Sequence, residues 1–273
     1  MKKVLFSLIA LTTLLAACSA APAEVEEKTV SVGLECAYAP FNWTQVDASE
    51  TAVEIDEDGA GYCDGYDIQI AKAIADDMGA TLIVKKIAWD GLIPALVNGE
   101  IDMIVAGMTD TEERRQTIDF SNQYYQSDMV LIVNKDSAYA SATSVAEFDG
   151  ASVIAQMNTF HDTIVDQIPN VNHLTPLGSF ALLTNAVVQG EADAMVSEYP
   201  VALSIVANNP SLMIVQFAAG SGFELNFEDT TVSVAVRKGE TDFVNQINAV
   251  LDSIDQDTRN AWMADAISRQ PQE

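Results

Sequence analysis

Basic residues are scarce in this chain. Its 273 residues include 13 Lys and Arg against 40 Asp and Glu, which gives a formal net charge of −27 at pH 7. Such a surface repels the phosphates of nucleic acids and the headgroups of anionic lipids, so we expect neither as a partner. Because positive charge is so rare, an arginine at a predicted binding position carries more weight here than in a balanced sequence.

Motifs for catalysis and for metal binding are also lacking. The sequence contains no nucleotide-binding loop, zinc motif or nucleophile elbow, and its two histidines lie apart at positions 161 and 173. The segment from Glu54 to Gly59 resembles the start of a calcium loop, but Gly65 stands where such a loop needs its last glutamate. We therefore expect no metal site and no cofactor.

Long apolar runs are absent after the first residues. Lys2 and Lys3 precede an apolar stretch at 4–17 that is too short for a membrane span and ends in small residues. The residues LAAC at 15–18 match the lipobox of bacterial lipoproteins, which predicts a signal peptide at 1–17 and a lipid on Cys18. The alternative is an ordinary secretory leader with an incidental cysteine.

Residues 18–28 are rich in Ala, Glu and Pro and show no hydrophobic period, which predicts a flexible tether before a folded part that begins near Thr29. Without Lys2 and Lys3, the chain has 11 basic residues against 40 acidic ones, a formal charge of −29. About half of the chain is apolar, at 49%, so a full hydrophobic core is possible and disorder is excluded.

Cysteines are few. If Cys18 carries the lipid, Cys36 and Cys63 are the only other pair. A location outside the cytoplasm permits a disulfide between them, and two separate buried thiols are the alternative. A bridge would fix the segment around Tyr38.

From residue 66 onward, helical and strand patterns alternate. We expect helices at 66–78, 89–98, 111–116, 159–168, 180–189, 199–208, 241–254 and 257–268. We expect strands at 81–87, 101–106, 129–133, 152–156, 192–197, 212–217 and 231–237. This alternation predicts an α/β fold with mainly parallel sheets.

A weak internal repeat suggests two similar lobes. The segment ALVNGEIDMIVA at 95–106 and the segment AVVQGEADAMVS at 186–197 share Ala, Val, Gly, Glu, Asp and Val at matching places. Each copy reads as a helix, a glycine stop and a buried strand. The alternative is that any helix-glycine-strand unit has this appearance.

Six segments spread over the chain resemble one protein family. They are AYAPFNW (37–43), GYDIQIAKAIA (65–75), WDGLIPALVNGEIDMIVAGMTDTEERRQTIDFSNQYY (89–125), GASVIAQMNTFHD (150–162), GEADAMVSEYPVA (190–202) and VSVAVRKGE (232–240). They resemble the polar amino-acid-binding proteins of ABC importers, which have the type II periplasmic-binding-protein fold.

The resemblance implies two α/β lobes joined by two hinge strands. Lobe one would comprise 29–126 plus 232–273, and lobe two 127–231. The ligand would lie in the cleft between the lobes, which close on it by a hinge movement. The implied function is to bind a free polar L-amino acid, with a basic one as an option, outside the cytoplasm. The implied partners are an ABC permease and its ATPase subunit, and we expect a monomer held at the cell membrane only by its lipid.

The resemblance also implies how the carboxylate of an amino acid would be bound. The arginine that holds it corresponds to Arg114, whose guanidinium can grip a carboxylate with two hydrogen bonds. Thr109 would add a hydroxyl or backbone N–H, and Gly107 would let the backbone approach closely. Thr159 begins a predicted helix, whose N-terminal N–H groups favour an anion. The alternative for Arg114 is a surface ion pair with a neighbouring glutamate.

Other positions would bind the rest of the ligand. Glu198 corresponds to the acid that pairs with the ammonium group, although an acid at a helix start is the alternative. Tyr38 corresponds to the aromatic residue that packs over the ligand, and Leu92 would line the same wall. Glu35 corresponds to a position whose side chain contacts the end of the ligand side chain and selects for its chemistry. Gln156 would flank the site in lobe two.

Three expectations near this site are open. Phe41, Trp43 and Trp89 fit the core as well as the cleft. His161 flanks the lobe-two site together with Gln156; we expect its side chain at the surface, and a contact with the ligand is the alternative. Ala106 stands where some binders of basic amino acids carry serine, so basic and neutral ligands are both compatible with the sequence.

We expect a binding protein and no enzyme. The same fold is known for dehydratases of small carboxylates, in which Glu198 could act as a general acid. A ligand-sensing accessory protein is the other alternative.

Overall fold

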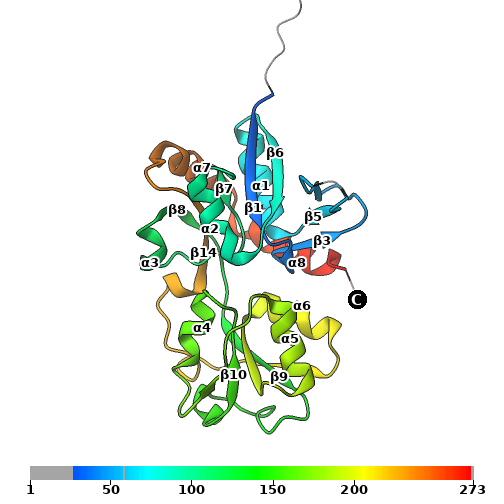
Figure 1. Cartoon of the computed structure of the whole chain (residues 1–273), viewed down its shortest axis with the longest axis vertical. Coiled ribbons are helices and arrows are strands. Elements are labelled where there is room, and N and C mark those ends of the chain that lie inside the picture. Colours follow the sequence, from blue (N-terminus) through cyan, green and yellow to red (C-terminus); the bar gives the residue numbers. More distant parts are fainter. Residues whose placement is uncertain (1–26, 58, 272–273) are drawn as a thin grey trace, which may run out of the picture.

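Two lobes, each built around a five-stranded sheet, form the described part of the molecule (Figure 1). The computed structural model describes residues 27–57 and 59–271. The predicted signal peptide, the lipidated Cys18 and the tether up to residue 26 lie outside the described residues. Within the described ranges, no helix is long and apolar enough to cross a membrane. The predicted α/β class is confirmed, and the exact limits of the lobes stay a prediction.

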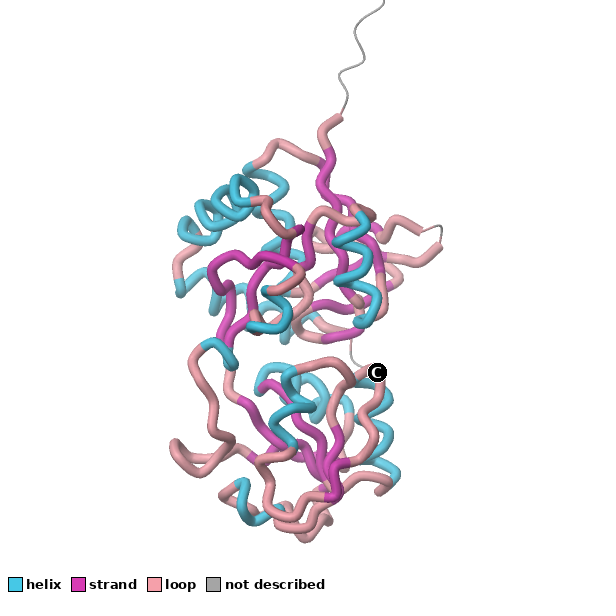
Figure 2. The backbone as a smooth tube through the Cα atoms, turned by 60° about the vertical axis from the view of Figure 1, so that its left-hand side comes forward, coloured by secondary structure: helices cyan, strands magenta, loops and turns pink. Residues whose placement is uncertain are grey.

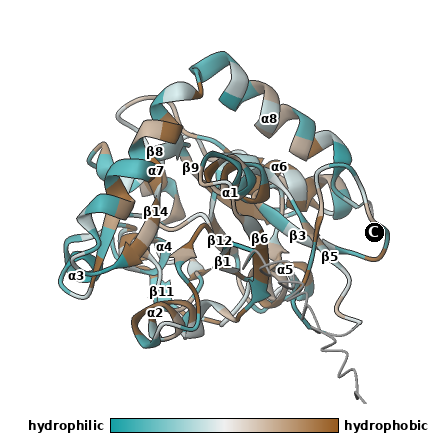
Figure 3. Ribbon diagram, turned by 90° about the horizontal axis from the view of Figure 1, so that it is seen from above, coloured by the Kyte–Doolittle hydropathy of each residue, from teal (hydrophilic) through white to brown (hydrophobic). Residues whose placement is uncertain are grey.

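The sheet of the first lobe has the strand order β6-β1-β7-β14-β8. Its strands are β1 (Thr29–Leu34), β6 (Thr81–Lys86), β7 (Met103–Ile104), β8 (Ile118–Gln126) and β14 (Thr231–Arg237). The helices of this lobe are α1 (Tyr66–Asp77), α2 (Trp89–Asn98), α3 (Glu112–Arg115), α7 (Thr241–Ser253) and α8 (Gln256–Arg269). Helix α1 packs on α7 and α8, whereas α2 packs on β1 and β7. Figure 3 shows hydrophilic and hydrophobic residues alternating along α7 and α8 on the outside of the lobe.

The sheet of the second lobe has the order β11-β10-β12-β9-β13. Its strands are β9 (Met129–Asn134), β10 (Ser152–Ile154), β11 (Asn172–His173), β12 (Ala194–Glu198) and β13 (Leu212–Val215). The helical segments are α4 (Phe160–Val165), α5 (Phe180–Gln189), α6 (Tyr199–Asn208) and the 3₁₀ turns η1 (Val145–Phe148) and η2 (Glu228–Thr230). The run MVLIV of β9 is buried at every position, as expected for a strand that is covered on both faces.

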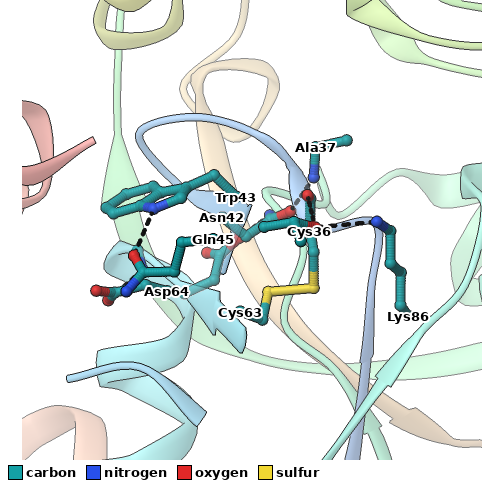
Figure 4. Close-up of a disulfide and its surroundings, with 11 residues drawn as sticks. Cys36, Ala37, Asn42, Trp43, Gln45, Cys63, Asp64 and Lys86 are labelled. Carbon is teal, nitrogen blue, oxygen red and sulfur yellow. Dashed lines mark hydrogen bonds between the residues drawn. A yellow bond between two sulfur atoms is a disulfide. The ribbon is translucent and has the colours of Figure 1, made fainter. Parts of the chain in front are cut away.

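A smaller sheet with the order β2-β3-β5-β4 extends from the first lobe. It consists of β2 (Ala37–Tyr38), β3 (Asn42–Gln45), β4 (Val53–Glu54) and β5 (Tyr62–Asp64). Cys36 and Cys63 form a disulfide, with their Cα atoms 5.6 Å apart (Figure 4). The sequence left a bridge and two thiols open, and the structure forms the bridge. It ties the start of β2, and with it Tyr38, to β5.

The prediction of mainly parallel sheets is wrong. Among the described strands, β1 pairs in parallel with β6 and β7, and β10 with β11 and β12. The strands next to the two crossings between the lobes, β8, β9, β13 and β14, pair antiparallel. Figure 2 shows the chain passing between the two groups of strands on one side of the molecule. Strand β8 was not predicted, because IDFSNQYYQ has no regular alternation of apolar and polar residues along its whole length.

The internal repeat corresponds to equivalent structure. Gly99 ends α2 and Gly190 ends α5, both in the left-handed conformation, with φ of 78° and 74°. Asp102 accepts a hydrogen bond from the backbone N–H of Ser31 at 2.9 Å, and Asp193 accepts one from the N–H of Ser152 at 2.8 Å. The shared aspartate therefore ties each repeat to the neighbouring parallel strand of its own sheet.

Candidate functional site

A pocket lies between the two lobes, where the carboxyl ends of strands and the first turns of helices meet. It is lined by Glu35, Tyr38, Trp89, Ala106, Gly107, Thr109 and Arg114 from the first lobe and by Gln156, Thr159, Phe160 and His161 from the second. This is the place where open α/β sheets bind ligands. The cavity left between these side chains measures about 10 Å³, room for roughly one water molecule. The lobes therefore contact each other directly around the pocket.

Arg114 is held on three sides. It lies in α3, whose N-cap Thr111 accepts a hydrogen bond from the Arg114 backbone N–H at 3.2 Å. Nη1 donates to the carbonyl of Thr109 at 2.7 Å and Nη2 to the carbonyl of Asn158 at 3.1 Å. The guanidinium carbon lies 5.2 Å from the centre of the Trp89 ring, a cation–π geometry. Arginine has five N–H donors, so donors remain for a carboxylate.

Burial lowers the pKa of Arg114 to about 10, so the side chain stays charged at neutral pH. The alternative of a surface ion pair with a neighbouring glutamate does not occur within the described residues, where the partners of the guanidinium are carbonyls and an aromatic ring. An arginine without a carboxylate partner at the edge of a pocket is well suited to bind an anionic group.

Glu35 and Gln156 face each other from opposite lobes. Gln156 Nε2 lies 3.4 and 3.5 Å from the two carboxylate oxygens of Glu35 and 3.2 Å from the carbonyl of Gly178. Burial raises the pKa of Glu35 to about 7, with a further rise from the charge of Asp90. The Gln156 amide and the backbone N–H of Trp89, at the start of α2, oppose this rise. Glu35 is therefore close to half ionised at neutral pH.

Tyr38 and Glu198 form a second contact between the lobes. The Tyr38 hydroxyl donates a hydrogen bond to Glu198, which ends β12 and is 1% exposed. The ring of Tyr38 stacks on Phe41 at 5.5 Å and meets Phe180 at 4.7 Å. Burial raises the pKa of Glu198 to about 8, so much of it is protonated at neutral pH.

Gly107 lets the backbone approach the Tyr38 ring. Its φ is +60°, and a Cβ atom added there would lie 2.9 Å from Tyr38 Cε1. Both the left-handed conformation and the close contact therefore favour glycine at this position.

A buried polar network behind the pocket explains Asp67, which belongs to the segment GYDIQIAKAIA at 65–75. Asp67 is fully buried and accepts hydrogen bonds from the Tyr124 hydroxyl at 2.7 Å and from Asn42 Nδ2 at 2.8 Å. The Tyr124 hydroxyl in turn accepts the backbone N–H of Gly107 at 3.0 Å. Asn42 Oδ1 accepts the N–H of Ala37 at 3.3 Å, next to Tyr38 in β2. One carboxylate thus supports both the Gly107 turn and the strand that carries Tyr38.

Of the remaining predicted site residues, Thr159 lines the pocket, whereas Leu92 and Glu198 do not. Leu92 is fully buried and is not among the pocket-lining residues. Its Cδ2 atom would lie 3.2 Å from a Cβ atom added to Gly33 of β1. Leu92 therefore packs in the core of the first lobe. Glu198 lies behind Tyr38, outside the pocket lining. Thr159 lines the pocket, and its hydroxyl donates to the carbonyl of Gln156 at 2.7 Å.

Of the two positions left open for His161, the structure shows the one that faces the pocket and not the expected one at the surface. His161 is 7% exposed and lines the pocket because α4 begins at Phe160, which turns its first residues toward the first lobe. Burial and the charge of Arg114 lower its pKa to about 4, so the ring is neutral. Its Nδ1 has no hydrogen-bond partner among the described residues. Phe160 and Asn158 were not predicted as site residues, although both lie in the segment 150–162 that resembles the family.

Comparisons with known proteins agree with this geometry. The family described as bacterial extracellular solute-binding proteins, family 3, matches residues 30–265. A probable histidine-binding protein of Neisseria gonorrhoeae is 28% identical over 86% of this chain and 81% of its own length. An ABC transporter glutamine-binding protein of Bacillus subtilis is 30% identical over 73% of this chain and 71% of its own.

Solved structures are similar as well. An amino acid ABC transporter substrate-binding protein from Streptococcus pneumoniae bound to L-arginine superposes with a TM-score of 0.75. It is 28% identical, and the match covers 88% of this chain and 94% of that one.

Proposed function

The chain belongs to the bacterial extracellular solute-binding proteins of family 3, and on this premise we propose that its interlobe pocket binds a free L-amino acid for an ABC importer. The family and the named relatives support an amino-acid-binding substrate-binding protein that works outside the cytoplasm. The roles of individual residues, given next, are part of the proposal.

The observation that carries the proposal is the distribution of charge around the pocket. Arg114 lines the pocket with free N–H donors, the carboxyl group of Glu35 lines the same pocket, and the buried carboxyl group of Glu198 lies behind Tyr38. A free amino acid is a zwitterion whose carboxylate and ammonium both need partners once water is expelled. Arg114 would hold the carboxylate and Glu198 the ammonium, with Tyr38 covering the ligand.

The ligand class follows from Glu35. An approaching cation or amide donor favours the ionised form of a carboxyl group whose pKa is about 7, so the pocket favours a ligand whose side chain ends in such a group. The relatives named as binders of histidine, glutamine and arginine carry ligands of this kind. We infer a polar amino acid and treat a basic side chain and an amide as the two options.

Anchoring and partners complete the proposal. The lipobox supports a lipid on Cys18, and the tether would let the folded part reach a permease in the same membrane. We propose that the protein acts as a monomer and passes its ligand to an ABC permease driven by an ATPase subunit.

A dehydratase-like enzyme is a second candidate. A glutamate with a pKa of about 8 remains protonated near neutral pH and could serve as a general acid. The two curated relatives described above are named as binding proteins, which supports binding over catalysis. Mass spectrometry of small carboxylates incubated with the protein separates the two, because an enzyme would change their mass.

Thermal unfolding tests the main proposal. The purified protein is melted in the presence of each of the twenty amino acids, ornithine, citrulline and cystine. One or a few L-amino acids should raise the melting temperature, since a ligand at a hundredfold excess over Kd adds about 2.7 kcal/mol to the free energy of unfolding. Absence of a shift with every amino acid would refute the proposed function.

A further inference from the structure

Asn158 has an unusual backbone for its residue type. It lies in the loop between β10 and α4, between the pocket residues Gln156 and Thr159, and its φ is +59°. Few residues other than glycine adopt this left-handed region, and asparagine is among those that tolerate it. The conformation directs both the carbonyl and the side chain of Asn158 toward the first lobe.

Three hydrogen bonds join Asn158 to that lobe. Its carbonyl accepts from Trp89 Nε1 at 3.2 Å and from Arg114 Nη2 at 3.1 Å. Its side-chain Nδ2 donates to Asp90 Oδ1 at 2.8 Å. Trp89 and Asp90 are the first two residues of α2. One residue of the second lobe therefore forms hydrogen bonds both with the first turn of α2 and with Arg114.

The contact has consequences for both side chains that share the carbonyl. The indole N–H can only donate, and the Trp89 ring is 9% exposed, so its partner is supplied by the opposite lobe. The Arg114 guanidinium is aimed by the Thr109 carbonyl of its own lobe and by the Asn158 carbonyl of the other. The guanidinium is therefore held at both ends only while the lobes touch.

We propose that Asn158 is a positioning residue that clasps the lobes together and completes the orientation of Arg114. This rests on the proposed function, in which Arg114 holds the ligand carboxylate. Because its three bonds join the two lobes, the clasp acts once the lobes have closed on the ligand. It therefore slows the escape of the ligand and has little effect on its entry.

A matched pair of variants isolates the side-chain bond of the clasp, the one from Asn158 to Asp90. Asn158→Gly keeps the left-handed backbone and removes the amide that binds Asp90. Asn170→Gly is the control, because Asn170 also has a positive φ of 49° and donates from Nδ2 to Asp149 at 2.7 Å, a contact within the second lobe. Both asparagines are exposed and both donate to an aspartate, so the variants differ in whether the lost bond crosses the cleft.

Stopped-flow fluorescence with L-arginine and L-glutamine as probes measures association and dissociation rates. Asn158→Gly should dissociate about fivefold to tenfold faster, the size expected for one typical hydrogen bond between exposed groups, with association within about twofold of wild type. Asn158→Ala, which also disfavours the left-handed backbone, should dissociate faster still. In an Asp90→Ala background, the Asn158→Gly change should add almost nothing. A dissociation rate for Asn158→Gly equal to that of Asn170→Gly overturns the clasp.

Failure of the proposed function gives a different result. If neither probe binds the wild-type protein, small-angle X-ray scattering of the three proteins without amino acid decides the clasp alone. Asn158→Gly should then show a larger radius of gyration than both wild type and Asn170→Gly. Equal radii would overturn the clasp.

Discussion

Binding of a neutral amino acid should weaken steeply as the pH falls below 8, because Glu198 must lose a proton to pair with the ligand ammonium. Without ligand, Glu198 is 1% exposed and its pKa is about 8, raised by burial from the ordinary value of 4.5. The Tyr38 hydroxyl, which donates to it, opposes that rise. The perturbation is therefore the pH itself, between 6 and 8.

The magnitude follows from the ionised fraction. With a pKa of about 8, Glu198 is half ionised at pH 8 and about 1% ionised at pH 6. If only the ionised form binds, the apparent Kd for a neutral ligand should rise roughly fiftyfold over this range, which corresponds to about 2 kcal/mol. A neutral ligand without a side-chain amide is chosen so that Glu35, whose pKa is about 7, contributes little.

Isothermal titration calorimetry with L-leucine, in buffers of different ionisation enthalpy, measures the change in Kd and the protons released on binding. At pH 7 the protein should release close to one proton for each ligand bound, which makes the observed heat depend on the buffer. Glu198→Gln should bind more weakly at pH 8 and lose the pH dependence between 6 and 8. A flat profile for wild type, or an equal slope in Glu198→Gln, would refute the assignment of Glu198 to the ammonium.

Other perturbations test the remaining parts of the site. Arg114→Ala should lose more than about a hundredfold in affinity, because an unpaired buried carboxylate costs about 3–5 kcal/mol, with an unchanged circular dichroism spectrum; near-wild-type titration would show that another residue holds the carboxylate. Glu35→Gln should weaken binding of L-arginine far more than that of L-leucine, and equal losses would make Glu35 structural. Replacing Cys36 and Cys63 by serine should lower the free energy of unfolding by roughly 3.5 kcal/mol, the chain-entropy value for a loop of 27 residues; unchanged denaturant melts would contradict it. Because burial raises the pKa of Glu198, its contribution to stability is present below pH 4.5 and is lost as the pH rises through 8. The unliganded protein should therefore lose up to about 5 kcal/mol from this group over that range, and Glu198→Gln should lose less in urea melts at the same pH values.

The helices and buried strands were largely readable from the sequence. The amphipathic pattern of 66–78 and the glycine stops at 99 and 190 mark helices that the structure contains, with α1 ending at Asp77. The strand β8 was missed, because its polar residues are spread over a strand that leaves the first lobe. Predicted lengths were also too generous where loops enter the pocket: the helix expected at 159–168 spans Phe160–Val165.

The candidate site was predicted mainly through the family resemblance, which gave each residue a chemical role. Arg114, Thr109, Gly107, Tyr38, Glu35 and the second-lobe residues Gln156 and Thr159 all line the pocket. Leu92 was misplaced, because an apolar residue on α2 fits the core and the cleft equally well in a one-dimensional pattern. The surface position was favoured for His161 for a related reason, since whether the first turn of α4 faces solvent depends on the opposite lobe.

The sequence by itself determined the α/β class, the two repeated units and the chemical types of the groups that could bind an amino acid, because these depend on periodicity, glycine stops and side-chain chemistry within short segments. Tertiary structure alone decided which of those groups meet. Glu35 and Gln156, Tyr38 and Glu198, and Asn158 and Arg114 are far apart in the chain and come together only across the contact between the lobes. The raised pKa values of Glu35 and Glu198 arise in the same way, since the burial that causes them is created when the two lobes exclude water from the pocket between them.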